Sequence, residues 1–170
     1  FSTTTADKTI VPNFIYNQWQ MNIILVGDNE VSSTKSSAIY NHYGPMTVSG
    51  TGKLTISGNY GIYNNGSFIQ NGGTLNVTGR QFGLYGSSDN IKFTINDGVL
   101  IVTGGSDASI SCKQATGQLI LGTGVTITQP YGAQWNSDKY AVVDAEGNPI
   151  KSKVTIAKGA AACGLAYSTT

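Results

Sequence analysis

The sequence predicts an all-β fold, a single-stranded parallel β-helix of about five to six short coils. The first observation behind this prediction is an internal repeat, in which residues 45–66 are followed by a similar segment at residues 67–86. The phrase Gly61-Ile62-Tyr63 returns 22 residues later as Gly83-Leu84-Tyr85. A period of this size in an apolar, turn-rich chain is typical of solenoids, in which one coil cannot bury its own apolar face.

The second observation is the alternation of apolar and polar residues within the repeated segments, as in Leu54-Thr55-Ile56 and Val125-Thr126-Ile127. A period of two places one face of a strand inside the protein and the other in water. A slip by one residue would turn the apolar columns outward, so we expect a fixed register. Matching the repeats pairs Val48 with Ile69, Leu54 with Leu75, and Ile56 with Val77.

Each coil is expected to contain three strands and three turns. The regular coils span residues 21–130, with boundaries expected at residues 21–44, 45–66, 67–90, 91–117 and from residue 118 onward. Glycines such as Gly50 and Gly98 separate the strands, because glycine reaches positive φ without steric cost. The inward residues expected in the first and third strands include Ile24, Val26, Val48, Ile69, Ile39, Ile62, Leu84 and Ile110.

The chain is expected to form one domain, residues 1–170, whose ends depart from the repeat. The sequence leaves two interpretations of residues 1–20 open. These residues either cover the first coil, with Phe14, Tyr16 and Trp19 as the covering side chains, or form an incomplete coil.

The C-terminal part, residues 131–170, is expected to hold a loop, the last strands and a cap. Residues 131–140 suit the loop, and Ala141-Val142-Val143 suits a return to the third strand position. Residues 153–156 predict a last strand, and residues 160–163 are expected to end or cap the stack.

Composition excludes several classes of protein. The chain has a formal net charge of +1 and only 11% charged residues. A nucleic-acid-binding domain usually carries a basic stripe, so no nucleic-acid partner is expected. No apolar run is long enough to cross a membrane, so no membrane insertion is expected. The chain begins at Phe1 without methionine, which indicates a mature or trimmed chain and leaves room for a lost export signal.

The phrases ILVGDNEV, MTVSGTGKLTISG, IQNGGTLNVTG and INDGVLIVTGG resemble right-handed β-helix repeats of bacterial cell-surface proteins, including modules classed as carbohydrate-binding. The resemblance covers about residues 21–128 and extends weakly to Ala157. It implies a right-handed solenoid, export and an extracellular or cell-surface location. Such repeats occur in adhesins, glycan binders and proteins of unknown role, so the resemblance is specific for fold and not for activity.

A column of tyrosines is the first candidate site. Tyr40, Tyr63 and Tyr85 each follow a predicted core residue, so alternation places them outside on successive coils, and Ser111 interrupts the column on coil four. Exposed rings in a row offer apolar faces and hydroxyl edges on which sugar rings can lie. Two alternatives remain open. One is a ladder that only stabilises the sheet, at about 0.2–1 kcal/mol per aromatic pair, and the other is a protein-contact surface.

The second candidate is a column of turn residues. Asp28, Asn71 and Asp97 occupy roughly matching corners of the repeat. Calcium binds several carboxylate and carbonyl oxygens, but two aspartates on non-adjacent coils make a sparse site. The alternative is Asx-turn chemistry, in which the side chain bonds nearby backbone. No cofactor is therefore expected, and calcium is the one ion that the pattern would fit.

Two further features are expected to be structural. Asn41 and Asn64 match across coils one and two and are expected to form an inward amide ladder. Cys112 follows Ile110 by two positions and is expected to face the core. A bridge from Cys112 to Cys163 would tie the tail to coil four, and separate thiols are the favoured alternative.

Candidate catalytic residues are sparse. A catalytic site needs a nucleophile with a base, or paired carboxylates, in one cleft. His42 is the only histidine and is expected to be exposed in a turn, Arg80 is the only arginine, and Lys92 and Lys113 have no convincing carboxylate cluster. No catalytic residues are therefore expected.

Together these patterns favour a non-catalytic extracellular binding module whose partner is a polysaccharide or surface glycan. The alternative is a structural or adhesin segment of a surface protein, with a host or cell-surface protein as its partner. An enzyme of the lyase or hydrolase type, acting on an acidic polysaccharide, comes third.

Overall fold

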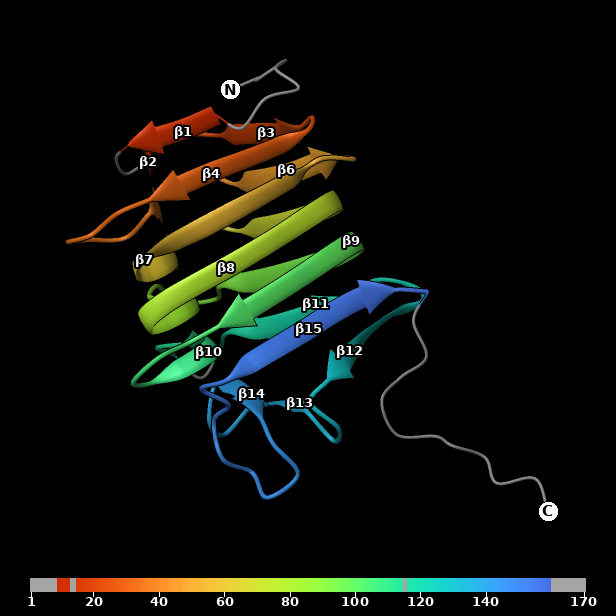
Figure 1. Ribbon diagram of the computed structural model, residues 1–170. Coiled ribbons are helices and arrows are strands. Elements are labelled where there is room, and N and C mark those ends of the chain that lie inside the picture. Colours follow the sequence, from red (N-terminus) through yellow and green to blue (C-terminus); the bar gives the residue numbers. More distant parts are fainter. Residues whose placement is uncertain (1–8, 13–14, 115, 160–170) are drawn as a thin grey trace.

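Alternating strands and sharp turns stack the chain into a β-solenoid of about four turns (Figure 1). The computed structural model describes residues 9–12, 15–114 and 116–159. These residues form fifteen strands and no helix. The strands are β1 (Thr9–Pro12), β2 (Ile15–Asn17), β3 (Met21–Leu25), β4 (Asp28–Ser32), β5 (Ile39–Asn41), β6 (Met46–Gly50), β7 (Lys53–Asn64), β8 (Phe68–Gly86), β9 (Lys92–Thr103), β10 (Ala108–Cys112), β11 (Gln118–Leu121), β12 (Val125–Gln129), β13 (Gln134–Asn136), β14 (Ala141–Val143) and β15 (Lys153–Lys158).

The strands stack on three faces, which we number in the order in which the chain passes through them. The first face holds β3, β6, β11 and the first segments of β8 and β9. The second face holds β1, β4, β12, β15 and segments of β7, β8 and β9. The third face holds β2, β5, β10, β13, β14 and the last segments of β7 and β8.

Parallel, in-register stacking builds the core from columns of equivalent side chains. Every residue of three such columns is at most 3% exposed. The columns are Met46–Phe68–Phe93 on the first face, Val31–Ile56–Val77–Val102 on the second and Ile39–Ile62–Leu84–Ile110 on the third. The predicted matches of Leu54 with Leu75 and of Ile56 with Val77 are confirmed.

Glycine is required at the corner between the first and second faces. Gly50 and Gly98 have φ of 96° and 88°, values that other residues rarely adopt. A Cβ atom at either position would lie 2.3 Å from a backbone oxygen of the neighbouring coil, that of Leu25 or of Gly73 respectively. The corner therefore needs glycine both for its backbone conformation and for the close approach of successive coils.

The predicted amide ladder is confirmed inside the third corner. Asn41 and Asn64 are fully buried, and Nδ2 of Asn41 donates to Oδ1 of Asn64 at 2.7 Å and to the carbonyl of Gly44 at 2.8 Å. Nδ2 of Asn64 donates in turn to the carbonyl of Gly66. The ladder ends on the next coil, where Gly86 pairs with Asn64.

The register predicted for the first face is wrong by one residue in places. Val48 pairs with Gln70, not with Ile69, and Gln70 is fully buried. Its amide Nε2 donates to the carbonyls of Val99 at 3.1 Å and Gly73 at 3.2 Å, which satisfies the donor side of the buried amide, whereas its Oε1 has no hydrogen-bond partner. Phe68 takes the inward place, which turns the half-buried Ile69 outward.

The first-face strand of coil one is also shifted by one residue from the predicted register. Ile24 and Val26 were expected inside, but they are 48% and 44% exposed. Ile23 and Leu25 point into the core instead, because Ile23 pairs with Val48 and continues its column. In an apolar run of this kind, alternation alone leaves two registers open.

The coil number is also lower than predicted, because the parallel stack ends at the fifth coil. β11 continues the first face in parallel, but β15 lies between β9 and β12 and is antiparallel to both (Figure 1). β14 returns to the third face as expected and pairs antiparallel with β10 through Ser111 and Ala141. Residues 160–163, the expected cap, lie outside the described residues.

At the other end, the described residues before Met21 add one strand each to the second and third faces. β1 pairs with β4 and β2 with β5, both parallel and in register. Tyr16 belongs to an outer column and Trp19 is 80% exposed, so neither covers the core. Phe14, the third expected covering residue, lies outside the described residues.

The amide ladder yields a stability prediction. Replacing Asn64 with Ala removes the acceptor of Asn41 and the donor to Gly66 inside the protein. We expect the free energy of unfolding to fall by about 1–3 kcal/mol, because a buried polar group that loses its partner keeps its desolvation cost. Urea unfolding of Asn64→Ala measures this, with Asn76→Ala, a half-buried position of β8, as the control. Equal losses in both variants would contradict the ladder's role.

Candidate functional site

The predicted tyrosine column is present and is one ring longer than expected. Tyr40, Tyr63 and Tyr85 pair in register on the third face, and Ser111 takes the next place. Tyr16 pairs with Tyr40 and adds a ring at the start of the column. The sequence did contain a signal for this ring, because Ile15-Tyr16-Asn17 repeats Ile39-Tyr40-Asn41 residue for residue.

The rings of the column pack on one another along the solenoid. Successive ring centroids from Tyr16 to Tyr85 lie 5.3, 5.0 and 5.5 Å apart, with interplanar angles of 25°, 42° and 57°. Neighbouring rings are therefore in contact along the whole column, stacked at its start and increasingly tilted toward Tyr85. This geometry differs from the flat platform of exposed ring faces that the sequence analysis considered.

A second row of rings widens the column on its later coils. Tyr60 and Phe82 pair across β7 and β8, and their rings stack at 5.6 Å with an interplanar angle of 11°. Phe82 lies 4.4 Å from Tyr85 and Tyr60 lies 5.1 Å from Tyr63, between ring centroids. The sequence analysis missed this row, although the two residues are one repeat apart.

Exposed ring faces lie at the beginning of the column, at the corner between the third and first faces. Trp19 and Tyr43 are 80% and 71% exposed. Both line a pocket of about 470 Å³, to which Gln18, Gln20 and Pro45 also contribute. The pocket therefore combines two aromatic rings with two side-chain amides.

His42 connects this pocket to the column. Its ring centroid lies 3.8 Å from that of Tyr43 and 5.4 Å from that of Tyr40, and Oη of Tyr16 lies 3.2 Å from its Nδ1. The expectation of an exposed, unengaged histidine is therefore wrong, since the side chain is half-buried among rings. We use the term aromatic strip for Tyr16, Trp19, Tyr40, His42, Tyr43, Tyr60, Tyr63, Phe82 and Tyr85.

Packing in the strip changes the acidity of its phenols. The pKa values of Tyr40, Tyr60 and Tyr85 are raised above the ordinary value of 10.0, mainly because burial disfavours the phenolate and secondly because Tyr63 lies nearby. Nδ2 of Asn65 donates to Oη of Tyr40 at 3.4 Å and opposes the shift there. The phenols of Tyr40, Tyr60 and Tyr85 are therefore neutral at physiological pH.

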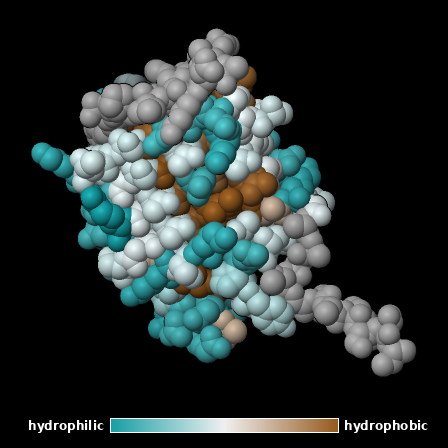
Figure 2. All heavy atoms as spheres, in the orientation of Figure 1, coloured by the Kyte–Doolittle hydropathy of each residue, from teal (hydrophilic) through white to brown (hydrophobic). Residues whose placement is uncertain are grey.

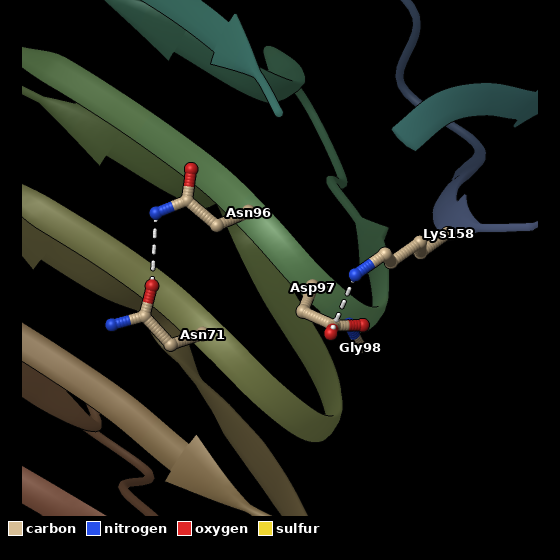
Figure 3. Close-up of polar contacts among 5 residues, drawn as sticks. All are labelled: Asn71, Asn96, Asp97, Gly98 and Lys158. Atoms are coloured by element: carbon tan, nitrogen blue, oxygen red, sulfur yellow. Dashed lines mark hydrogen bonds and ion pairs between the residues drawn. The ribbon is translucent and has the colours of Figure 1, made fainter. Parts of the chain in front are cut away.

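The column of turn residues does not form as predicted. Asn71 pairs with Asp97, but Asp28 pairs with Lys53 in a different column. Nζ of Lys158 on β15 lies 2.9 Å from Oδ2 of Asp97 (Figure 3). This contact links the inserted strand to the corner of β9.

The polar contacts at this corner are those of turn chemistry. The backbone N–H of Gly98 donates to Oδ1 of Asp97 at 2.7 Å, and Nδ2 of Asn96 donates to Oδ1 of Asn71 at 2.9 Å (Figure 3). The hydrogen bond from Lys158 and then that from Gly98 lower the pKa of Asp97. Asp97 therefore has a cation and the N–H of the next residue as partners, which differs from an Asx turn, whose side chain bonds the backbone two residues on.

Arg80, another candidate residue, is engaged in a structural contact. Nη2 of Arg80 donates to the carbonyl of Thr34. Among residues 9–12, 15–114 and 116–159, no three His, Cys, Asp or Glu side chains group as a metal site. The same residues contain no helix long and apolar enough to span a bilayer.

Cys112 faces the core as predicted. It is a free thiol, 5% exposed, and burial raises its pKa to about 12. Cys163, the partner considered for a bridge, lies outside the described residues.

Comparison with protein-family models, with curated proteins and with solved structures returned no match. The assignment of the β-solenoid therefore depends on the repeat and on the strand pairing.

The raised phenol pKa values predict a loss of stability in alkali. A group whose pKa is raised by folding stabilises the native state below its ordinary pKa, and that contribution is lost as the pH rises. We expect the melting temperature to fall as the pH passes about 10, and to fall less steeply in Tyr85→Phe, which keeps the ring without the phenol. Melting curves across alkaline pH measure this, and equal slopes in the two proteins would contradict it.

The burial of Cys112 predicts an unreactive thiol. In a Cys163→Ser background, Cys112 is the only thiol of the chain. We expect very slow reaction of the native protein with a disulfide reagent at mildly alkaline pH, because the reagent needs the exposed thiolate. Reaction should become fast in denaturant, and a fast native reaction would show that the site opens readily.

Proposed function

We propose that this protein is a non-catalytic module that binds a glycan chain along the aromatic strip. The observation that carries the proposal is the pocket at the start of the strip, where Trp19 and Tyr43 lie with Gln18 and Gln20. Aromatic faces cover the apolar C–H face of a sugar ring, and side-chain amides hydrogen-bond its hydroxyl groups. Both rings are largely exposed, so a sugar can reach them without moving the protein.

The tyrosine column supports the proposal as a track that leads away from this pocket. Coils repeat about every 4.8 Å, and the column carries one phenol at each coil from Tyr16 to Tyr85. A phenol hydroxyl both donates and accepts hydrogen bonds. A polymer of sugars would therefore meet the same polar groups at regular intervals.

The proposal extends to location and kind of module. The repeat phrases resemble right-handed β-helix modules of bacterial cell-surface proteins, and the low content of charged residues suits such a module. We therefore place the proposed binding outside the cell or at its surface, with a polysaccharide or surface glycan as the partner.

A structural or adhesin segment with a protein partner is the second candidate. It is favoured by the mutual packing of the column's rings, since each aromatic pair adds about 0.5–1.5 kcal/mol to stability. The exposed Ile24 and Val26 on the first face also suit a protein contact. An enzyme acting on an acidic polysaccharide is the third candidate.

Aromatic substitutions test the proposal. In a glycan array followed by titration, with and without calcium, we expect Trp19→Ala combined with Tyr43→Ala to weaken binding about thirtyfold or more, as for truncated aromatic anchors. Tyr131→Ala, which removes another exposed ring outside the strip, is the control.

A second pair of substitutions tests whether the tyrosine column contacts the glycan or only stabilises the sheet. Tyr63→Ala with Tyr85→Ala should abolish glycan binding if the column contacts the chain, provided that circular dichroism shows an intact fold. Unchanged affinity in this variant would leave the column a structural ladder. Unchanged affinity in both double variants would remove the aromatic strip as the binding surface.

A further inference from the structure

The end of the tyrosine column leaves a groove on the third face. Ser111 takes the place that Tyr85 holds on the coil before it, so a short side chain stands where a fifth ring would continue the column. A pocket of about 300 Å³ lies there, between the rings of Phe82 and Tyr85 and the residues that flank β14. The interruption of the column therefore creates the groove.

We propose that this groove binds an anionic sugar residue, one that carries a carboxylate or a sulfate. The inference rests on the proposed glycan-binding function and names the class of glycan. It makes the groove a second subsite at the far end of the aromatic strip from Trp19 and Tyr43.

Charge is the first argument for an anionic ligand. Lys139, which precedes β14, and Lys151, which follows it, both line the groove, and both are exposed. Neither ammonium group has a carboxylate oxygen within 4.0 Å among the described residues. The groove thus holds two cations outside any ion pair of the described residues against the one carboxylate of Asp107, and this excess favours an anion, to which each lysine can donate charge-assisted hydrogen bonds.

Asp107, the acidic residue in the groove, suits the neutral hydroxyl groups of a sugar. Asp107 accepts a hydrogen bond from Oγ of Ser106 at 2.9 Å and is exposed. Its remaining oxygen lone pairs can accept from sugar hydroxyl groups. The groove therefore offers cations for the charged substituent and a carboxylate for the neutral hydroxyl groups.

The aromatic wall accounts for selection of a sugar over a simple anion. The rings of Phe82 and Tyr85 lie 4.4 Å apart at 32°, and both border the groove. Such a wall offers apolar surface to the C–H face of a sugar ring. An inorganic anion would use the lysines and leave this wall uncovered.

Ser111 supplies an independent sign of an incomplete site. It is 5% exposed, and its Oγ has no hydrogen-bond partner. A buried hydroxyl without a partner is unfavourable and is rare in folded proteins. Because this Oγ is shielded from solvent, a ligand hydroxyl would satisfy it only by displacing a neighbouring side chain of the groove.

Titration calorimetry of the full chain tests the inference with matched ligands. The probes are the tetramer of galacturonic acid, its carboxyl-reduced neutral form and a sulfated galactan tetramer. We expect the acidic probes to bind about tenfold or more tightly than the neutral form, and this preference to shrink as salt is raised. The two acidic probes show whether carboxylate or sulfate is the preferred group.

Two variants locate the effect in the groove. Lys139→Gln with Lys151→Gln should lose the preference, whereas Lys53→Gln with Lys92→Gln, an equal change of charge at exposed lysines elsewhere, should keep it. Ser111→Tyr, which would continue the column into the groove, should also lose it. If Ser111→Tyr does not fold, the lysine variants still decide the matter, because both lysines are exposed.

The outcomes separate this inference from the proposed function. Neutral and acidic probes that bind equally would overturn the inference and leave glycan binding at Trp19 and Tyr43 intact. A preference that survives Lys139→Gln with Lys151→Gln would also overturn it. Failure of every probe to bind would overturn the inference, while the glycan array decides the proposed function separately.

Discussion

In-register pairing between successive coils is the constraint on which the rest of the structure depends. Because each strand bonds to an equivalent strand about 4.8 Å away, a side chain is placed directly against its own equivalent. Apolar residues then form the buried columns, the two inward asparagines form an amide ladder, and the outward tyrosines form a row of rings. The core and the candidate site are thus two results of the same stacking.

The repeat made most of this arrangement predictable from the sequence. The period, the second and third faces, and the tyrosine column follow from residues that recur at matching positions. The first face was harder, because Phe68 and Ile69 are both apolar and either can point inward. The choice depends on Gln70, whose amide finds acceptors in the backbone of coils three and four. A sequence pattern does not reveal those acceptors, since they are formed only when the coils stack.

The end of the stack was not predictable for a different reason. Residues 118–129 continue the repeat, and by pattern they should stack as a full fifth coil. Instead β15, which comes later in the chain, lies between β9 and β12 and reverses the strand direction. Which strand pairs with the free edge of β9 therefore depends on contacts between segments far apart in the sequence.

The outward side of this second face is mostly hydrophilic or neutral, with a small apolar patch near its centre (Figure 2).

Stacking also limits what a repeated site can do. Rings in register cover one another, so a column of tyrosines gains packing at the expense of exposed ring faces. Binding surface then remains where the repeat is broken. Trp19 and Tyr43 are exposed near the start of the solenoid. Ser111 replaces a ring on β10, the last parallel strand of the third face. The regular coils fix the distance between these two places, and the departures from the repeat give each its own chemistry.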